Sequence, residues 1–243
     1  MTDEAIALQI VDSLAVDKNA DVLEIGPGTG VLTKSLLQQY PRLKAMDVDF
    51  DSIEYLKKHY PDFEDKIVHE NFLKCDIDQH FKNSFSVIGN FPYNISSQIF
   101  FKVLDHINKV DVVVCMLQRE VADRIASPPG KKAYGILSVF LQAYYKVEKL
   151  FDVPPDSFNP PPKVWSSVIR LERNSTTDLK CDEKQFRKVV KAGFQMRRKT
   201  LRNALKGLNL PAGISSLEVF NKRAEQLSVA DFVDLTKLIY GDE

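Results

Sequence analysis

The stretch "VIGNFPYNIS", Val87–Ser96, places polar groups directly after an apolar run. A strand through it would end at Asn90, and ligands bind at the carboxyl ends of strands in open α/β sheets. If the Asn90 side-chain oxygen and the Phe91 carbonyl each accept one N–H of an adenine amine, the nitrogen lone pair is aimed at an electrophile. Pro92 stiffens this turn, and Tyr93 offers an aromatic face for the base. A plain tight turn explains Pro92 and Tyr93, but not a polar Asn90.

A glycine loop, Gly26, Gly28 and Gly30, follows a short apolar strand and opens a helix. Nicotinamide, flavin and S-adenosylmethionine binders share such a loop, which also occurs as a plain tight turn. The spacing differs from the Gly-x-Gly-x-x-Gly that seats a pyrophosphate. Glu24, two residues earlier, places a carboxylate at the strand end facing the crevice, where it would repel a pyrophosphate but suit a cationic sulfonium. We therefore expect S-adenosylmethionine as the ligand.

Further ligand contacts are expected after the second and third strands. Asp47 ends the second strand, where a carboxylate can accept both ribose hydroxyls of an adenosyl group. Asp49 falls on the same face by strand alternation, so the sequence leaves both open, and we prefer Asp47. Asn71 and Phe72 follow the third strand, where the amide can pair with an adenine edge and the phenyl can stack on the ring. A loop turn and a core aromatic explain these two residues nearly as well.

Hydrophobic periodicity predicts alternating helices and strands that would position these residues. The predicted helices are Ile6–Leu14, Leu32–Tyr40, Asp51–Tyr60 with Asp51 as its cap, Ser96–His106 and Ala133–Tyr145. The predicted strands are Val22–Ile25, Leu43–Val48, Lys66–Asn71, Phe85–Asn90, Val110–Leu117, Glu148–Val153 and Lys163–Arg173. The alternation favours an α/β fold, a doubly wound, Rossmann-like and mainly parallel sheet with both faces covered.

The chain after this sheet has a different character. The proline-rich Pro154–Pro162 joins the last two strands, which we expect to form a hairpin at one sheet edge. The polar Arg173–Lys180 is typical of a linker, and the remainder is predicted to be helical, with Ser228 and Asp231 forming a variant capping box. We therefore expect a ligand-binding domain over residues 1–173 and a small all-helical C-terminal domain over residues 180–243.

Composition restricts the class of protein. The chain has 243 residues, is 44% hydrophobic and 27% charged, and so is long enough for one α/β core and a smaller appendage. No apolar run is long enough to span a bilayer, and the acidic N-terminus does not resemble a signal peptide, so we expect a cytoplasmic protein without membrane contact. Cys75, Cys115 and Cys181 lie far apart and outside any Cys-x-x-Cys pair. Neither a disulfide framework nor a metal site is expected.

The net charge of zero conceals a basic segment. Lys184–Lys206 contains nine basic residues and no acid, which is typical of a surface that binds a polyanion. A solvated helix face explains the segment about as well. Val189, Val190 and Phe194 share a helical face that should be buried, which would turn the basic side chains outward.

Four motifs occur in order along nearly the whole chain: "LEIGPGTG", "GNFPYNISSQIFF", "SFNPPPKVWSSVIRL" and "FQMRRKTLRNAL". Together they resemble the small-subunit ribosomal RNA adenine dimethyltransferases. The first motif is shared by many S-adenosylmethionine enzymes, whereas Asn-(Leu or Phe)-Pro-Tyr marks RNA adenine dimethylases. The last motif favours the small-subunit branch over the branch that modifies large-subunit RNA.

The resemblance implies an activity and further site residues. It implies transfer of four methyl groups, two to each of two adjacent adenosines in the 3′-terminal hairpin loop of small-subunit RNA, on the immature 30S subunit. It places Phe158 of the proline-rich loop against the target base, opposite Tyr93. It also implies RNA contacts in the C-terminal domain by Arg197, Arg198, Lys199 and Arg202. We expect the protein to act as a monomer.

Three features depart from the family's usual pattern. The family begins with a basic segment carrying Gly-Gln-(Asn or His)-Phe-Leu, which closes over the methyl donor, whereas this sequence starts directly at the first predicted helix. We expect this departure to affect affinity for S-adenosylmethionine. Asp47 stands where Glu is common and Asn71 where Asp is common, so the Asn71 amide must turn its oxygen towards the adenine N6 hydrogen.

Two other classes of function compete with this interpretation. Relatives of the fold act as mitochondrial transcription factors that hold nucleic acid without methylating it, and the missing lid motif favours that class. The intact Asn90–Tyr93 motif disfavours it. A small-molecule methyltransferase would explain the first half of the chain but not the basic Lys184–Lys206 segment.

Overall fold

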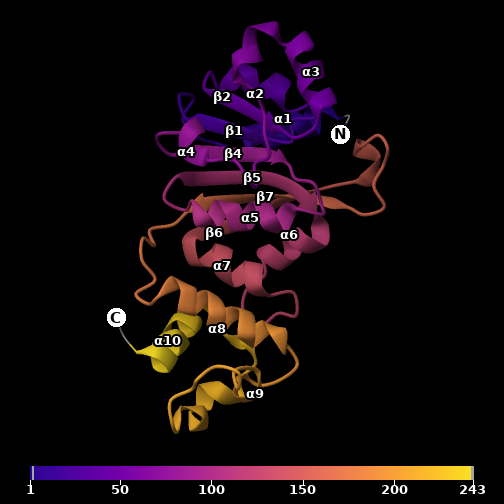
Figure 1. Ribbon diagram of the computed structural model, residues 1–243. Helices are drawn as coiled ribbons and strands as arrows, with labels where there is room; N and C mark the ends of the chain where they lie inside the picture. Colours follow the sequence, from indigo (N-terminus) through magenta and orange to yellow (C-terminus); the bar gives the residue numbers. More distant parts are fainter. Residues whose placement is uncertain (2, 242–243) are drawn as a thin grey trace. The chain divides into compact units, whose positions relative to one another are not determined.

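The computed structural model describes Met1 and residues 3–241 (Figure 1). The chain divides into two compact units, Met1–Ala122 with Lys146–Arg173, and Asp123–Tyr145 with Asn174–Glu243. The second unit therefore contains a segment, residues 123–145, that the sequence led us to expect in the first domain. Within the described residues, no helix has both the length and the apolar character that crossing a membrane requires.

The first unit is built on a seven-stranded sheet with the order β3-β2-β1-β4-β5-β7-β6. The strands are β1 Asp21–Ile25, β2 Leu43–Asp47, β3 Ile67–His69, β4 Phe85–Asn90, β5 Val110–Gln118, β6 Tyr145–Val153 and β7 Ser166–Arg173. Neighbours from β3 to β5 pair in parallel, and β7 pairs antiparallel with β5. The predicted doubly wound, mainly parallel sheet is confirmed, and β6 and β7 lie at one edge as expected.

The order of the strands creates a switch point between β1 and β4. The chain passes from β1 outward through β2 and β3, then returns to place β4 on the other side of β1. Loops after β1 and β4 therefore diverge at the carboxyl ends of adjacent strands, which is where open α/β sheets bind ligands. Both predicted motifs, the glycine loop after β1 and the Asn90 motif after β4, lie at this switch point.

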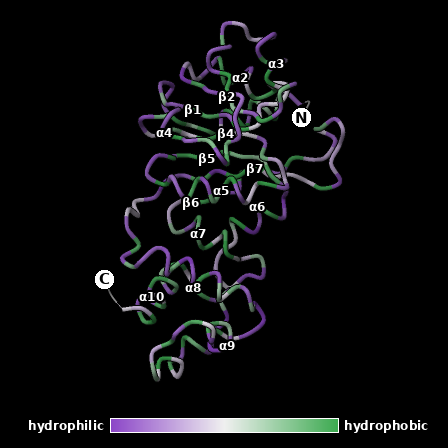
Figure 2. The backbone as a smooth tube through the Cα atoms, in the orientation of Figure 1, coloured by the Kyte–Doolittle hydropathy of each residue, from purple (hydrophilic) through white to green (hydrophobic). Residues whose placement is uncertain are grey.

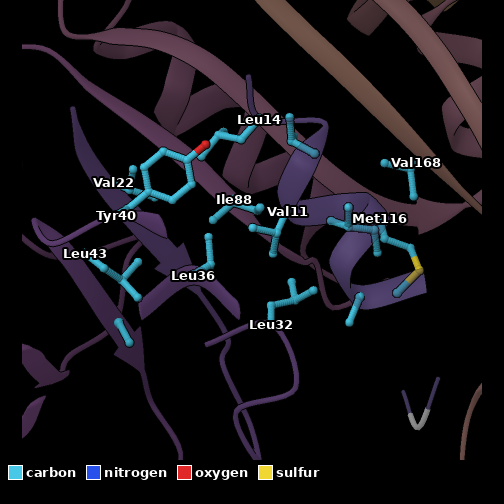
Figure 3. Packing of buried hydrophobic residues seen from close by; sticks show 14 of the residues in the cluster. Val11, Leu14, Val22, Leu32, Leu36, Tyr40, Leu43, Ile88, Met116 and Val168 are labelled. Atoms are coloured by element: carbon cyan, nitrogen blue, oxygen red, sulfur yellow. The ribbon is translucent and has the colours of Figure 1, made fainter. Parts of the chain in front are cut away.

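Helices cover both faces of the sheet. They are α1 Glu4–Asp12, α2 Thr33–Gln39, α3 Phe50–His59, α4 Ile77–His80, α5 Ser96–Asp105 and α6 Arg119–Ile125, the last of which crosses the boundary between the units. Val87 and Ile88 point to opposite faces of β4, and neither has solvent-exposed area. Figure 3 shows Ile88 packing with side chains of α1 and α2, including Val11 and Leu36.

One helix prediction needs correction, and one helix was not predicted. The cap of α3 is Asp49, not Asp51, because the Asp49 carboxylate accepts the Asp51 N–H at 3.3 Å and the Ser52 hydroxyl at 2.7 Å. Helix α6 was not predicted, since it follows β5 without an intervening turn signal. Strands β4 and β5 are predominantly apolar (Figure 2), which is why their positions could be predicted closely. Strand β6 carries charged residues and begins at Tyr145, three residues before its predicted start and at a residue that was predicted to end a helix.

The second unit is helical, with α7 Ile136–Tyr144, α8 Glu183–Gln195, α9 Leu201–Ala204 and α10 Val229–Tyr240. Short 3₁₀ turns, not long helices, connect α9 to α10. As predicted, Val189, Val190 and Phe194 of α8 are buried. The predicted capping box is also confirmed, because the Asp231 N–H donates to the Ser228 hydroxyl and the Ser228 N–H donates to the Asp231 carboxylate.

Candidate active site

The glycine loop is shaped by left-handed backbone conformations. Gly26, Gly28 and Gly30 have φ of 68°, 54° and 82°, values that a side chain would strain. The Gly26 N–H donates to the Met46 carbonyl at 3.0 Å, which fixes the start of the loop to the end of β2. A Cβ on Gly28 would meet no atom within 4 Å, so the loop backbone is open to a ligand there.

Gly30 has a packing role that the sequence did not reveal. A Cβ at this position would lie 2.8 Å from the Leu56 side chain and 3.1 Å from the Tyr60 ring. Glycine is therefore needed at Gly30 for the loop to pack against α3. Gly89 is comparable, because its Cβ would lie 2.4 Å from the Ile25 carbonyl oxygen. The ends of β1 and β4 can approach each other only because Gly89 has no side chain.

The structure gives Asp47 and Asp49 different roles. One Asp47 carboxylate oxygen accepts the Asp49 N–H at 3.0 Å, and the other lies 3.4 Å from the Gly28 nitrogen. The Asp47 carboxylate therefore connects the end of β2 to the glycine loop. Asp49 is exposed and caps α3. The geometry favours Asp47 as the residue available to a bound ligand.

A cleft lies at the carboxyl ends of β1, β2 and β3. It is open to solvent, and its cavity volume is about 60 Å³. Its lining combines two carboxylates with mainly apolar side chains and consists of Ile25, Gly26, Met46, Asp47, Val48, Glu70, Asn71, Phe72, Leu73, Pro92, Ile95 and Ile99. Apolar walls with a few polar groups are typical of sites for flat organic ligands. Four of the predicted donor-site residues are thus brought together around one cleft.

Asn71 is held differently from the expectation. Its side-chain oxygen accepts the Leu73 N–H at 2.9 Å, which closes a local turn. The oxygen that was expected to accept an adenine N6 hydrogen is therefore already used once, although a carbonyl oxygen has a second lone pair. Phe72 is 5% exposed and forms part of the cleft wall.

Glu24 is buried beneath the glycine loop. It is 1% exposed, and the Thr33 hydroxyl donates to its carboxylate at 2.7 Å. Burial raises the pKa of Glu24 to about 8, and the nearby Asp47 charge adds to this shift. Glu24 is therefore largely protonated at neutral pH when no cation is near. A cationic group in the crevice would favour its ionised form.

In the motif at the end of β4, some groups are used for packing and others remain available to a ligand. Asn90 ends β4 and is half-buried, and the Phe91 N–H donates to the Met116 carbonyl at 3.0 Å. The Phe91 ring is buried edge-on against Phe100, with centroids 5.7 Å apart. Phe91 can therefore offer a ligand its carbonyl but not its ring. The Ile95 N–H closes the turn by donating to the Pro92 carbonyl at 3.1 Å.

This motif and the glycine loop are neighbours. A Cβ built on Gly26 would lie 3.9 Å from the Asn90 carbonyl oxygen. Pro92 lines the same cleft as Asp47 and Gly26. A donor bound by the loop after β1 would therefore lie beside the turn whose residues Asn90 and Phe91 are expected to hold an amine. The arrangement supports transfer of a group to an amine nitrogen.

The model of the family described as "Ribosomal RNA adenine dimethylase" matches residues 1–240. The chain belongs to this family. It is 54% identical over 99% of its length to a ribosomal RNA small subunit methyltransferase A of Cytophaga hutchinsonii, of which it covers 94%. It is 51% identical over 97% of its length to a protein of the same name from Parabacteroides distasonis, of which it covers 89%. The RNA methyltransferase activity expected from the motifs is thereby confirmed.

Solved structures agree with this family assignment. A dimethyladenosine transferase from Plasmodium falciparum is 26% identical and superposes with a TM-score of 0.83, over 97% of this chain and 95% of that one. The 23S rRNA methyltransferase ErmE has a TM-score of 0.71 at 20% identity, covering 96% of this chain and 97% of that one, which shows a shared fold.

The Tyr93 side chain of this dimethylase is linked to the start of β7, which follows an exposed tryptophan. The Tyr93 and Ser166 hydroxyls lie 2.7 Å apart, which joins the turn after β4 to the start of β7. Trp165, next to Ser166, is 47% exposed and was not singled out from the sequence. Phe158 is half-buried and packs against the hydrophobic cluster of the first unit. Trp165 is therefore the more exposed aromatic side chain.

The basic segment of the dimethylase contains two kinds of residue. Arg198, Lys199 and Arg202 are exposed, and Arg202 donates to the Asn221 side chain at 2.9 Å. The Arg197 guanidinium donates to the Glu225 carboxylate at 3.0 Å and to the Tyr134 carbonyl at 2.8 Å, and it also contacts the Lys132 carbonyl. Arg197 therefore holds parts of the second unit together.

Proposed function

We propose that this RNA methyltransferase transfers methyl groups from S-adenosylmethionine to N6 of two adjacent adenosines in the 3′-terminal hairpin loop of small-subunit ribosomal RNA. The observation that carries the proposal is that the turn starting at Asn90 lies beside the glycine loop: the Asn90 backbone carbonyl is near Gly26, and Pro92 lines the cleft with Gly26 and Asp47. Family membership and the names of the close relatives support the substrate class.

The cleft residues fit the adenosyl part of the methyl donor. The Asp47 carboxylate would accept the ribose hydroxyls, while Phe72 and Ile99 would contact the adenine ring. Asn71 would reach the ring edge through its second lone pair. Gly26 and Gly28 would approach the amino acid part through their backbone, and Glu24 would ionise beneath the cationic groups.

The acceptor adenine would lie on Tyr93, with N6 held by the Asn90 side-chain oxygen and the Phe91 carbonyl. The N6 lone pair then forms a bond to the methyl carbon, the carbon–sulfur bond breaks, and sulfur keeps that electron pair. The nitrogen releases a proton to water. Positioning and electrostatics suffice for this step, because the two acceptors favour the nitrogen as it becomes tetrahedral and positive.

RNA binding would combine aromatic contacts to bases with charged contacts to phosphates. Tyr93 and Trp165 offer aromatic faces to bases, and Phe158 remains a candidate for the face opposite Tyr93. Exposed Arg198 and Lys199, with Arg202, would neutralise phosphates. The immature 30S subunit is the proposed partner, and we expect a monomer that acts in the cytoplasm.

The test uses the purified chain, labelled S-adenosylmethionine and small subunits from cells lacking this modification. We expect label in dimethylated adenine at the two adjacent positions, located by mass spectrometry of nuclease fragments. Large subunits serve as the matched control and should remain unlabelled. Label at a different adenosine, or on another atom of the base, would contradict the proposed site and chemistry.

A further inference from the structure

Three side chains that bind metals in proteins converge beside the cleft. Glu70, Cys75 and His80 each place a ligand atom within 4.8 Å of the other two. The His80 Nε2 already lies 3.1 Å from a Glu70 carboxylate oxygen. Glu70 directly follows β3, Cys75 lies in the following turn and His80 ends α4, so the three are five residues apart each time. This spacing differs from the Cys-x-x-Cys pattern of common zinc sites, which is why the sequence did not suggest a site.

The backbone around the three side chains is well anchored. The Cys75 N–H donates to the Asn71 carbonyl at 2.8 Å, and the Lys102 ammonium donates to the Cys75 carbonyl at 2.8 Å. The Lys44 ammonium donates to the His80 carbonyl at 2.8 Å. The backbone carbonyls of Cys75 and His80 are thus each held by a lysine. The ligand positions are therefore set by the fold rather than by a free loop.

Burial and chemistry favour a borderline-soft divalent cation. Cys75 is 8% exposed and its thiol lies 3.3 Å from the Phe72 carbonyl, whereas the Glu70 side chain is 45% exposed. A cation would enter from the Glu70 side, where the exposed carboxylate has room to move inward. A sulfur, an imidazole nitrogen and a carboxylate form a set that suits zinc, with water as the fourth ligand.

We propose that Glu70, Cys75 and His80 form a zinc site. As the zinc–sulfur bond forms, the Cys75 thiol proton leaves to solvent and the zinc ion accepts the sulfur electron pair. No redox step is involved.

The site would influence the neighbouring cleft. Glu70 lines the cleft together with Asn71 and Phe72, and the metal would bind the first residue of this segment to Cys75 and His80. Drawing the Glu70 carboxylate towards the metal would reposition the segment that the adenine ring contacts. This consequence rests on the proposed function, whereas zinc binding itself does not.

The test titrates zinc into the tag-free, reduced full chain in competition with a chromophoric chelator, using a phosphine reductant and no methyl donor. We expect one zinc per chain, with affinity lowered at least tenfold by Cys75→Ser and by His80→Gln. Cys181→Ser and His59→Gln are matched controls that should bind as the parent does. Circular dichroism checks that each variant is folded.

Cobalt provides an independent readout of the sulfur ligand. The parent chain loaded with cobalt should show thiolate-to-cobalt charge-transfer absorption, which Cys75→Ser should abolish. A parent chain that binds no zinc, or a folded Cys75→Ser variant that binds it as tightly as the parent, would overturn the site. Unchanged affinity for the methyl donor in the zinc-loaded parent would overturn only the coupling to the cleft.

Discussion

The Tyr93 and Ser166 hydroxyls lie 2.7 Å apart and connect the turn after β4 to the first residue of β7. Ser166 is fully buried, so its partner is held in one place. The ring on which we propose the target base lies is therefore positioned by a residue from a distant part of the chain.

Loss of this hydrogen bond should reduce methylation without removing the aromatic face. We expect Tyr93→Phe and Ser166→Ala to lower kcat/KM by similar factors, and the double variant to be no worse than either one. Non-additivity of this kind is the signature of a shared interaction. Tyr55→Phe, an exposed tyrosine on α3, is the control. Additive losses would indicate that the two hydroxyls act independently.

Substitutions of Asp47 and of Asp49 should have different effects, the first on ligand binding and the second on stability. Asp47→Asn should weaken S-adenosylmethionine binding in calorimetry, because charge-assisted hydrogen bonds contribute about 1.5–3 kcal/mol each before compensation by water. Asp49→Ala should instead lower the free energy of unfolding by about 1 kcal/mol through loss of the α3 cap. Unchanged donor affinity in Asp47→Asn, or a large loss in Asp49→Ala, would reverse the assignment.

Glu24 should make stability fall as pH rises. Its folded pKa is raised to about 8 from the ordinary value of 4.5, so its contribution to stability is fully present below pH 4.5 and is lost as pH rises through 8. Each pKa unit corresponds to about 1.4 kcal/mol. Between pH 5 and pH 9, the free energy of unfolding of Glu24→Gln should therefore rise by more than about 1.4 kcal/mol relative to that of the parent.

Denaturant unfolding of both proteins at the two pH values measures this difference. Donor affinity of the parent should also increase with pH over the same interval, because binding of a cation releases the Glu24 proton. Glu24→Gln should lose that dependence. A parent and a variant with parallel stability profiles would show that Glu24 is ionised in the free protein.

Exposed cations of the C-terminal unit should bind RNA, while Arg197 should not. Replacing Arg198, Lys199 and Arg202 by alanine should flatten the salt dependence of binding by up to about three contacts, at roughly −0.7 to −0.9 per contact in a log–log plot. Affinity for unrelated RNA should fall equally, because phosphate contacts carry no sequence information. Donor affinity should not change. A triple variant with the parent's salt slope would show that these residues form only a solvated surface.

Arg197→Ala is the informative comparison for this segment. Its guanidinium bonds to Glu225 and to the Tyr134 carbonyl, so removal leaves a half-buried carboxylate without this partner. We expect lower stability with little change in salt slope. The reverse result, a stable protein with a flatter slope, would return Arg197 to the RNA-binding residues.

Much of the fold could be predicted because strand residues are apolar in continuous runs. The prediction of β4 as Phe85–Asn90 was confirmed residue for residue, and the motifs at its end could be placed without coordinates. The sequence could not show which aspartate caps α3 and which is available to the ligand, because Asp47, Asp49 and Asp51 are of one type and alternate along the chain. Only the hydrogen bonds show which carboxylate caps α3.

Other features depended on residues distant in sequence. The role of Arg197 depends on Tyr134 and Glu225, which no local pattern connects to it. The burial of the Phe91 ring against Phe100 likewise follows from tertiary packing. The convergence of Glu70, Cys75 and His80 requires the fold of the segment after β3.

Asn90→Ala tests the central claim most directly, because the proposal requires its side-chain oxygen to hold the adenine amine. Methyl transfer to small subunits is measured beside RNA affinity, with quenching of Trp165, the single tryptophan, as the binding signal. We predict that methylation is abolished while RNA affinity stays within a few fold of the parent value. Methylation within threefold of the parent rate would contradict the mechanism.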